Sequence, residues 1–405
     1  MDAYLLDWIN FLLRWAHVIV AIAWIGSSFY FVFLDSNLLK PTDPELIAKG
    51  VDGELWAVHG GGFYNPQKYM VAPRALPEHL HWFYRESYST WLTGFALFTA
   101  IYLFQADTFL IDPHVHAWSV PAAIAAALSF LVVFWLLYDA VCRAFDGRGS
   151  QKAAGALIAV LVAGAAWLAC HWFAGRAAFV LVGAMMATAM SANVFFWIIP
   201  GQRKVIAQMK AGAAVDPAHG RRAKQRSVHN TYFTLPVLAA MLSNHYAFLH
   251  GAAGNWIVLV AMMAAGALIR TSFVARHRAL VLGRRVPWEY AAAGCALLVG
   301  LGVWLRPAPA AIAPAGSSAA VAAPAPATFA QVQGIVKERC SLCHNAQLAN
   351  KGVRLDAPDQ ILAHAPQLYQ QAVVLKAMPL NNATRITDAE RDVLRRWYEA
   401  GANPD

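Results

Sequence analysis

Eight long apolar segments constrain the fold of this chain more than any other feature of its sequence. A helix needs about 20 mainly apolar residues to cross a bilayer. Of the 405 residues, 59% are hydrophobic and only 14% are charged, which excludes an ordinary soluble protein. We therefore predict an all-α fold with an eight-span transmembrane helical bundle. The segments cover residues 9–34, 88–104, 118–138, 154–173, 177–199, 232–249, 255–274 and 288–305.

The basic residues that give the chain its net charge of +9 are distributed according to the same apolar segments. Lys and Arg gather in every second connection between the apolar segments and are almost absent from the others. Basic loops stay on the cytoplasmic side of a membrane. Both chain ends are therefore expected on the outer side of the membrane. Because topology accounts for the positive charge, we expect no nucleic-acid partner.

The sequence CSLCH near the C-terminus is an attachment box for covalent c-type haem. It predicts that Cys340 and Cys343 carry the haem and that His344 ligates its iron. Met378, the only Met after the box, is predicted as the second iron ligand, since a thioether fills that position in many electron-transfer cytochromes. The alternative for Met378 is packing in the core. Together these residues predict a class I-like cytochrome c domain at residues 328–405, with one haem c. Thr387, followed three residues later by Glu390, predicts a capping box at the start of its last helix.

Two further segments complete the domain plan. Residues 307–327 contain no charged residue and are mostly Pro and Ala, which is typical of a semi-extended linker. Such a linker would reach about 65 Å at ~3.1 Å per residue, and would let the haem domain move between an electron donor and an acceptor. A passive connector fits the composition equally well. Residues 1–306 then form a transmembrane catalytic domain.

A polar insert at residues 35–87 interrupts the apolar segments. Connections of this length usually have a function. Three glycines follow His59 and permit positive φ and an anion-binding nest of backbone amides. Lys68 and Arg85 supply positive charge among many aromatic residues, and His59 and His81 can transfer protons near neutral pH. This set suits a planar, anionic, nitrogen-rich ligand. The alternative is an interfacial loop with its Trp and Tyr at headgroup level.

Histidines within the apolar segments are functional candidates, because ionisable residues are costly inside a membrane. His17 lies in the first segment and His245 near the end of the sixth. Under the expected topology both lie in the outer half of the membrane, where a relay to an external haem would be useful. They are the best candidates to bind a second, non-covalent haem b. Hydrogen bonding between helices is an equally good explanation for His17.

The chain resembles a known family. The run WAVHGGGFY, the later run LHWFYRESYSTWLTGF, the eight apolar segments and the tethered CxxCH domain are similar to those of bacterial integral-membrane cytochrome c urate oxidases (urate hydroxylases). The resemblance implies oxidation of urate to 5-hydroxyisourate in purine catabolism. It also implies that electrons pass through haem c to a soluble cytochrome c or a terminal oxidase of the respiratory chain, without forming hydrogen peroxide.

The composition of the insert agrees with this reaction. Urate is planar and anionic, and its hydroxylation removes two electrons and needs a base to activate water. We expect Lys68 or Arg85 to face the charge of urate and His59 or His81 to take a proton. Electrons would cross by way of a site near His17 and His245.

Two other functions are compatible with parts of the sequence. A quinol:cytochrome c electron-transfer protein would bind haem b in the membrane and would be indifferent to urate. A transporter with a cytochrome sensor would move its substrate without redox turnover. Neither accounts as well for the aromatic and basic insert.

Overall fold

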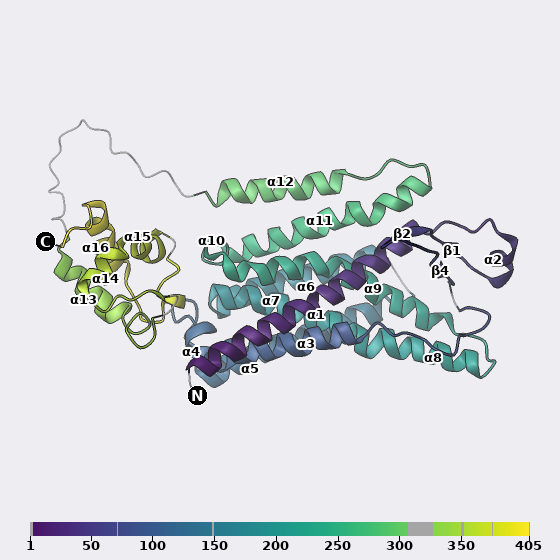
Figure 1. Cartoon of the computed structure of the whole chain (residues 1–405), viewed down its shortest axis with the longest axis horizontal. Helices are drawn as coiled ribbons and strands as arrows, with labels where there is room; N and C mark the ends of the chain where they lie inside the picture. Colours follow the sequence, from purple (N-terminus) through teal and green to yellow (C-terminus); the bar gives the residue numbers. More distant parts are fainter. Residues whose placement is uncertain are drawn as a thin grey trace.

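The computed structural model describes residues 3–70, 72–147, 150–306, 327–349, 352–374 and 376–404. Apart from its last residue, the predicted Pro/Ala linker lies outside these ranges. Long helices run side by side along one axis, and a separate helical domain lies at one end of them (Figure 1). The described part of the chain is mostly helical, which confirms the predicted helical character of the fold.

The helices of the bundle follow the apolar segments. Their bounds are α1 Ala3–Asn37, α3 Arg85–Phe98, α5 Val120–Ala144, α6 Gln151–Trp172, α7 Gly175–Ala192, α8 Ile199–Lys210, α9 Pro217–Leu242, α11 Asn255–Val281 and α12 Glu289–Trp304. Two π-helical segments, η1 Thr99–Leu103 and η2 Asn193–Ile198, continue α3 and α7, and η2 leads directly into α8. Short elements complete the bundle, namely α2 Pro44–Lys49, α4 Ala106–Phe109, η3 Ser243–His245 and α10 Ala247–His250.

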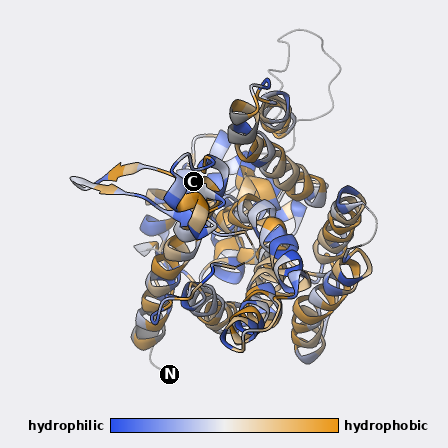
Figure 2. Ribbon diagram, turned by 90° about the vertical axis from the view of Figure 1, so that its right-hand side faces the viewer, coloured by the Kyte–Doolittle hydropathy of each residue, from blue (hydrophilic) through white to orange (hydrophobic). Residues whose placement is uncertain are grey.

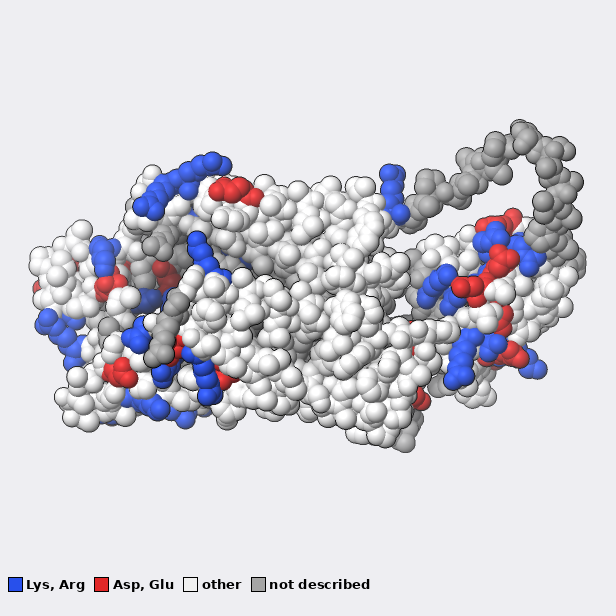
Figure 3. Space-filling model, turned by 180° about the vertical axis from the view of Figure 1, so that it is seen from behind, with Lys and Arg blue, Asp and Glu red and all other residues white. Residues whose placement is uncertain are grey.

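Several helices are long and apolar enough to cross a membrane. Among the described residues these are Trp8–Asn37, Val120–Ala144, Gln151–Trp172, Gly175–Lys210 and Asn255–Arg276, and α12 is a shorter apolar helix. Uncharged side chains cover the middle of the bundle on the face seen in Figure 3, while Lys, Arg, Asp and Glu lie towards its ends and on the terminal domain. We call the end formed by the insert, α8 and the start of α9 the basic end. That there are eight spans remains a prediction.

Helix α9 differs most from the predicted boundaries. The predicted segment 232–249 includes only its second half, because α9 begins at Pro217 and ends at Leu242. Asp216 caps the helix by accepting a hydrogen bond from the Ala218 amide at 2.8 Å, and proline is favoured in the first turn. The basic residues assigned to a loop therefore lie on a helix. Apolarity marks only the part of a helix within the hydrocarbon and misses a polar extension.

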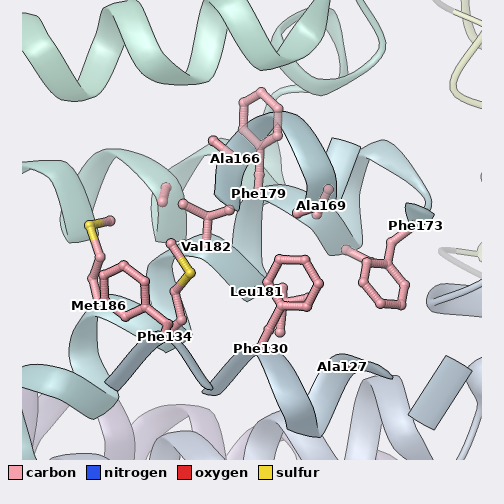
Figure 4. Close-up of a cluster of buried hydrophobic side chains, with 14 of the residues drawn as sticks. Ala127, Phe130, Phe134, Ala166, Ala169, Phe173, Phe179, Leu181, Val182 and Met186 are labelled. Atoms are coloured by element: carbon pink, nitrogen blue, oxygen red, sulfur yellow. The ribbon is translucent and has the colours of Figure 1, made fainter. Parts of the chain in front are cut away.

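The core of the bundle lies where α5, α6 and α7 meet. Large side chains interdigitate there, among them Phe130, Phe134 and Phe179 (Figure 4). Buried alanines, including Ala127 and Ala166, let the helices approach closely, as small residues do in membrane bundles. Helix α1 takes little part in this core: it packs mainly on α3, and many of its apolar side chains are exposed.

The terminal domain has its own small core. Its elements are α13 Phe329–Arg339, α14 Pro358–Ala363, α15 Ala365–Leu368, η5 Tyr369–Val374, η6 Leu380–Asn382 and α16 Asp388–Glu399. Helices α13 and α16 pack together, with Phe329 and Trp397 stacked at 5.7 Å between ring centroids. The capping box predicted for Thr387 and Glu390 is confirmed.

Among the residues that the structure describes, a polar contact joins the terminal domain to the bundle. The side-chain amide of Asn382 lies 3.0 Å from Nε2 of His114, in the connection between α4 and α5. This places the domain at the end of the bundle opposite the basic end (Figure 1).

The packing of α12 on α11 can be tested at a glycine. A Cβ added to Gly294 would lie 2.8 Å from the Ala265 carbonyl oxygen and 2.8 Å from Ile269 Cγ1. Because backbone cannot move aside locally, we expect Gly294→Ala to lower the free energy of unfolding by about 1–3 kcal/mol, measured as a lower thermal midpoint in detergent. Gly300→Ala is the control, since nothing lies within 4 Å of that position on the same helix. Equal losses in both variants would contradict the packing.

A second test concerns the ion pair between Arg339 and Glu390. The Glu390 carboxylate accepts hydrogen bonds from Arg339 Nε at 3.0 Å and from the Thr387 amide at 2.6 Å. Burial alone would raise the pKa of Glu390, but these donors outweigh it and hold the pKa below its usual value. The stabilisation is therefore complete above the unfolded-state pKa of about 4.3 and is lost as the pH falls through the folded-state value.

Glu390→Gln should therefore speed hydrogen exchange of the α16 amides at pH 7, and its difference from wild type should shrink below about pH 4. Glu338→Gln is the matched control, because Glu338 also contacts Arg339, at 3.4 Å, but is mostly exposed. A difference that persisted unchanged at low pH would contradict this account.

Candidate functional site

A cavity of about 1130 Å³ runs along the bundle between α1, α3, α7 and α9. At the basic end its lining includes Asp35, His81 and Lys224. At the opposite end it includes Arg14 and His245. The cavity exists because α1 packs mainly against α3 and leaves the facing sides of α7 and α9 uncovered. It therefore connects the end that carries the insert with the end beside the terminal domain.

The first turn of α3 places a carboxylate in the cavity wall. Glu86 lines the cavity, and its Oε2 atom is buried without a hydrogen-bond partner among the described residues. His81, Trp82 and Phe83 line the same cavity, and the His81 and Phe83 rings are in edge contact at 4.6 Å between centroids. A carboxylate with an unused acceptor and an imidazole on one cavity are both suitable groups for moving protons.

Aromatic rings supply flat surfaces further along α3. Trp91 and Phe95 stack with their centroids 5.2 Å apart and nearly parallel, and both line the cavity. Trp91 Nε1 donates to the Thr188 hydroxyl of α7 at 3.1 Å, which fixes the indole in place. A planar ligand could stack here, since ring faces favour offset stacking.

His17 faces the opposite half of the cavity and contacts α3. Its Nδ1 lies 3.0 Å from the Thr93 hydroxyl oxygen, and that hydroxyl lies 2.8 Å from the Ser89 carbonyl oxygen. When the hydroxyl donates to Ser89, His17 Nδ1 is the donor to Thr93, and Nε2 is then unprotonated and available as a ligand or an acceptor. The ring fits because position 94 is glycine: a Cβ there would lie 2.9 Å from His17 Cε1.

His245 lines the same cavity but lies on η3, where it is exposed. Its neighbour Asn244 accepts a hydrogen bond from the Tyr102 hydroxyl at 3.3 Å and another from Arg176. The structure therefore brings both predicted membrane histidines to one cavity, together with the polar groups that hold η3 against α7.

Three of the four predicted catalytic residues lie outside the cavity lining. His59 is exposed at the tip of a hairpin, and Arg85 is exposed at the start of α3. Lys68 forms an ion pair with Asp35, a residue at the mouth of the cavity that also pairs with Lys224 at 2.8 Å. His81 is the one of the four that lines the cavity.

The glycines after His59 form a hairpin turn. Strands β2 Ala57–His59 and β3 Gly62–Tyr64 pair in antiparallel register, with His59 opposite Gly62. Gly60 and Gly61 have φ of +59° and +80°, so the expected positive φ is confirmed and matches a two-residue hairpin turn. Strands β1 Gly53–Glu54 and β4 Gln67–Lys68 continue the ribbon towards α1.

This hairpin projects sideways from the bundle when the molecule is viewed from the basic end (Figure 2). Trp56, Val58 and Phe63 are exposed on it. Alternation along the paired strands puts these three side chains on one face of the ribbon. The arrangement agrees with the alternative expectation of an interfacial loop with its aromatic residues at headgroup level.

Sequence reasoning missed a polar network inside the bundle. Asp139 of α5 pairs with Arg226 of α9 at 2.7 Å, and both are buried. Asn193 and Asn230 continue the network towards the cavity. The predicted boundaries placed Arg226 in a cytoplasmic loop. The helix-start signal Asp-Pro at 216–217 would have shown that it lies on α9.

The predicted haem residues lie together in sequence at the end of α13. Cys340 caps that helix, and the His344 amide donates to the Cys340 carbonyl at 3.1 Å. Burial raises the pKa of the Cys340 thiol to about 12, whereas Cys343 is exposed. His344 Nδ1 donates to the Val353 carbonyl at 3.1 Å, which leaves Nε2 as the free nitrogen.

Met378 lies on the connection between η5 and η6. Its carbonyl accepts a hydrogen bond from Arg391 Nη1 at 2.9 Å, and its side chain is partly exposed. The side chain is therefore not part of the buried core of the domain, which was the alternative explanation for this residue.

Comparison with known protein families places this chain in a family. No curated relative and no solved structure matches the chain. A protein family described as Urate oxidase N-terminal matches residues 3–306, which include the whole bundle and its cavity. The match covers most of the 405 residues. The chain thus belongs to the urate oxidase N-terminal family.

Proposed function

We propose that this protein is a membrane-bound urate oxidase that passes the electrons of urate to a covalent haem c in its terminal domain. The family match supports urate oxidation. The observation that carries the rest is the cavity, which combines stacked aromatic rings and an unpartnered carboxylate with a path along the bundle towards the domain that holds the CSLCH box. Helices long enough to cross a membrane support an inner-membrane location. The basic connections, which stay on the cytoplasmic side, support a periplasmic terminal domain.

The reaction balances without oxygen. Urate and one water give 5-hydroxyisourate, two protons and two electrons. We assign the stacking surface to Trp91 and Phe95, and the removal of a proton from water to Glu86 or His81. Lys224 lies at the mouth of the cavity, where its charge favours the entry of an anion.

The terminal domain fits a covalent c-type haem. The Val353 carbonyl orients His344 so that Nε2 is free for iron, which is the usual arrangement around a ligating histidine. The Arg391 side chain holds the backbone of Met378, whose thioether would be the second ligand. The haem would supply one-electron transfer, so each urate requires two successive transfers to an external cytochrome c or terminal oxidase.

A second, non-covalent haem b in the cavity is a separate part of the proposal. The Nε2 of His17, which is free when Nδ1 donates to Thr93, and the position of His245 on the same cavity support it. Such a haem would supply a one-electron centre between the two ends of the bundle.

The first test measures reduction of the c haem when urate is added to purified protein without oxygen. Wild type should show the absorption bands of reduced haem. Glu86→Gln and His81→Ala should slow this reduction about 10²–10⁴-fold, the usual contribution of a general base, while dithionite still reduces the haem fully. His59→Ala is the control, because His59 lies on the hairpin outside the cavity lining. Loss of activity in His59→Ala alone would contradict a site in the cavity.

The second test concerns the iron ligands. Replacing Met378 with Ala should leave the covalent haem in place and lower its reduction potential, since a methionine ligand raises it. Redox titration of the full chain measures this, with Met70→Ala, an exposed methionine of the insert, as the control. Cys340→Ala with Cys343→Ala should abolish covalent haem in a pyridine haemochrome assay. An unchanged potential in Met378→Ala would show that another group ligates the iron.

A further inference from the structure

A charged pair is buried between α5 and α9. Arg226 Nη2 lies 2.7 Å from Asp139 Oδ1, and the two residues are 2% and 4% exposed. Trp197 Nε1 donates to the same carboxylate at 2.8 Å. Breaking a buried pair is costly, but replacing both charges with apolar side chains is often neutral or stabilising. Its presence therefore suggests a function other than stability.

The charge on Arg226 fixes the direction of a neighbouring amide. Arg226 Nη1 approaches Asn193 Oδ1 at 3.4 Å, and Asn193 is completely buried at the start of η2. A guanidinium offers only donors, so the Asn193 oxygen must face it. The Asn193 nitrogen then points away and donates to the Tyr138 hydroxyl and to Asn230 Oδ1, both at 2.9 Å.

The direction of Asn230 follows from that of Asn193. Because Asn230 Oδ1 accepts from Asn193, Asn230 Nδ2 faces the other way, where it donates to the Met190 carbonyl at 3.1 Å. An amide nitrogen carries two hydrogens, and Met190 is its one acceptor within the described ranges. Asn230 also lines the cavity. One of its N–H groups is thus left available at the cavity wall.

We propose that Asn230 binds the substrate by donating this N–H to an oxygen or a deprotonated nitrogen of urate, and that Asp139 and Arg226 are positioning residues that orient the amide. The identity of the ligand rests on the function proposed above. The chain of contacts runs from the charged pair through Asn193 to Asn230. Without the pair, Asn193 is free to rotate by half a turn, and Asn230 could then present its oxygen to an anionic ligand.

The test is a double-mutant cycle on the full-length protein, with urate-dependent haem reduction as the readout. Asn230→Ala should raise KM for urate about 10–100-fold, as expected when a hydrogen bond to a charged group is lost, with a smaller change in kcat. The paired change Asp139→Leu with Arg226→Met should raise KM similarly while keeping the bundle folded. Combining it with Asn230→Ala should add little, because both changes remove the same interaction.

Two variants make the result specific. Asn230→Asp keeps the shape but replaces the donor with a negative charge, and should weaken binding more than Asn230→Ala. Thr271→Val is the control, because it removes a hydroxyl that bonds only within α11, to the Ala267 carbonyl at 2.9 Å, and should leave KM unchanged. Where Asn230→Ala fails to fold, judged by a thermal midpoint in detergent far below that of wild type, Asn230→Ser takes its place.

The outcomes separate this inference from the proposed function. Wild type that does not oxidise urate overturns both. Wild-type turnover with an unchanged KM in a folded Asn230 variant overturns the role of Asn230 and leaves the function intact. Additive effects of the pair and of Asn230 overturn the positioning role of Asp139 and Arg226.

Discussion

Several helices of this protein are long and apolar enough to cross a membrane, and a bilayer interior offers no water to a polar group. Backbone groups must then be satisfied within helices, and charges are confined to the ends of the bundle unless they have partners. The middle of the face seen in Figure 3 is uncharged, in agreement with this rule. The buried pair of Asp139 and Arg226 is an exception with polar partners of its own, among them the Trp197 indole, which donates to Asp139, and the Asn193 amide oxygen, which faces Arg226.

The same constraint shapes the cavity. A transmembrane helix that packs on one neighbour costs little, because lipid covers its other faces as well as protein would. Helix α1 is long and apolar enough to be such a helix, and it packs mainly on α3 and leaves a space in front of α7 and α9. In a soluble protein that space would be closed by the hydrophobic effect. Here it persists and can hold a planar molecule, with polar groups supplied by α3 and α9.

Much of the architecture could be predicted from the sequence. The apolar segments gave the helices, and the capping box at Thr387 placed the last helix, because both depend on local sequence patterns. The cavity and the amide of Asn230 could not be found in this way. Their positions depend on which helix faces act as neighbours, and apolarity gives the presence of a helix but not its rotation. The π-helical turn at Asn193, which alters that rotation locally, leaves no clear sequence signal.

For the insert, the sequence indicated the local backbone conformation but not the structure that this conformation forms. Its composition correctly indicated the positive φ of Gly60 and Gly61, but a glycine run permits both an anion nest and a hairpin turn. Only pairing between strands decides between them, and the cross-strand partners Val58 and Phe63 were not evident from spacing alone.

The contact between His17 and Gly94 has a consequence for the variation of this sequence. The imidazole occupies the space that any larger side chain at position 94 would need. The two positions, 77 residues apart in the chain, are therefore expected to vary together. A relative that keeps the histidine should keep the glycine, and one that has lost the histidine is free to fill the gap.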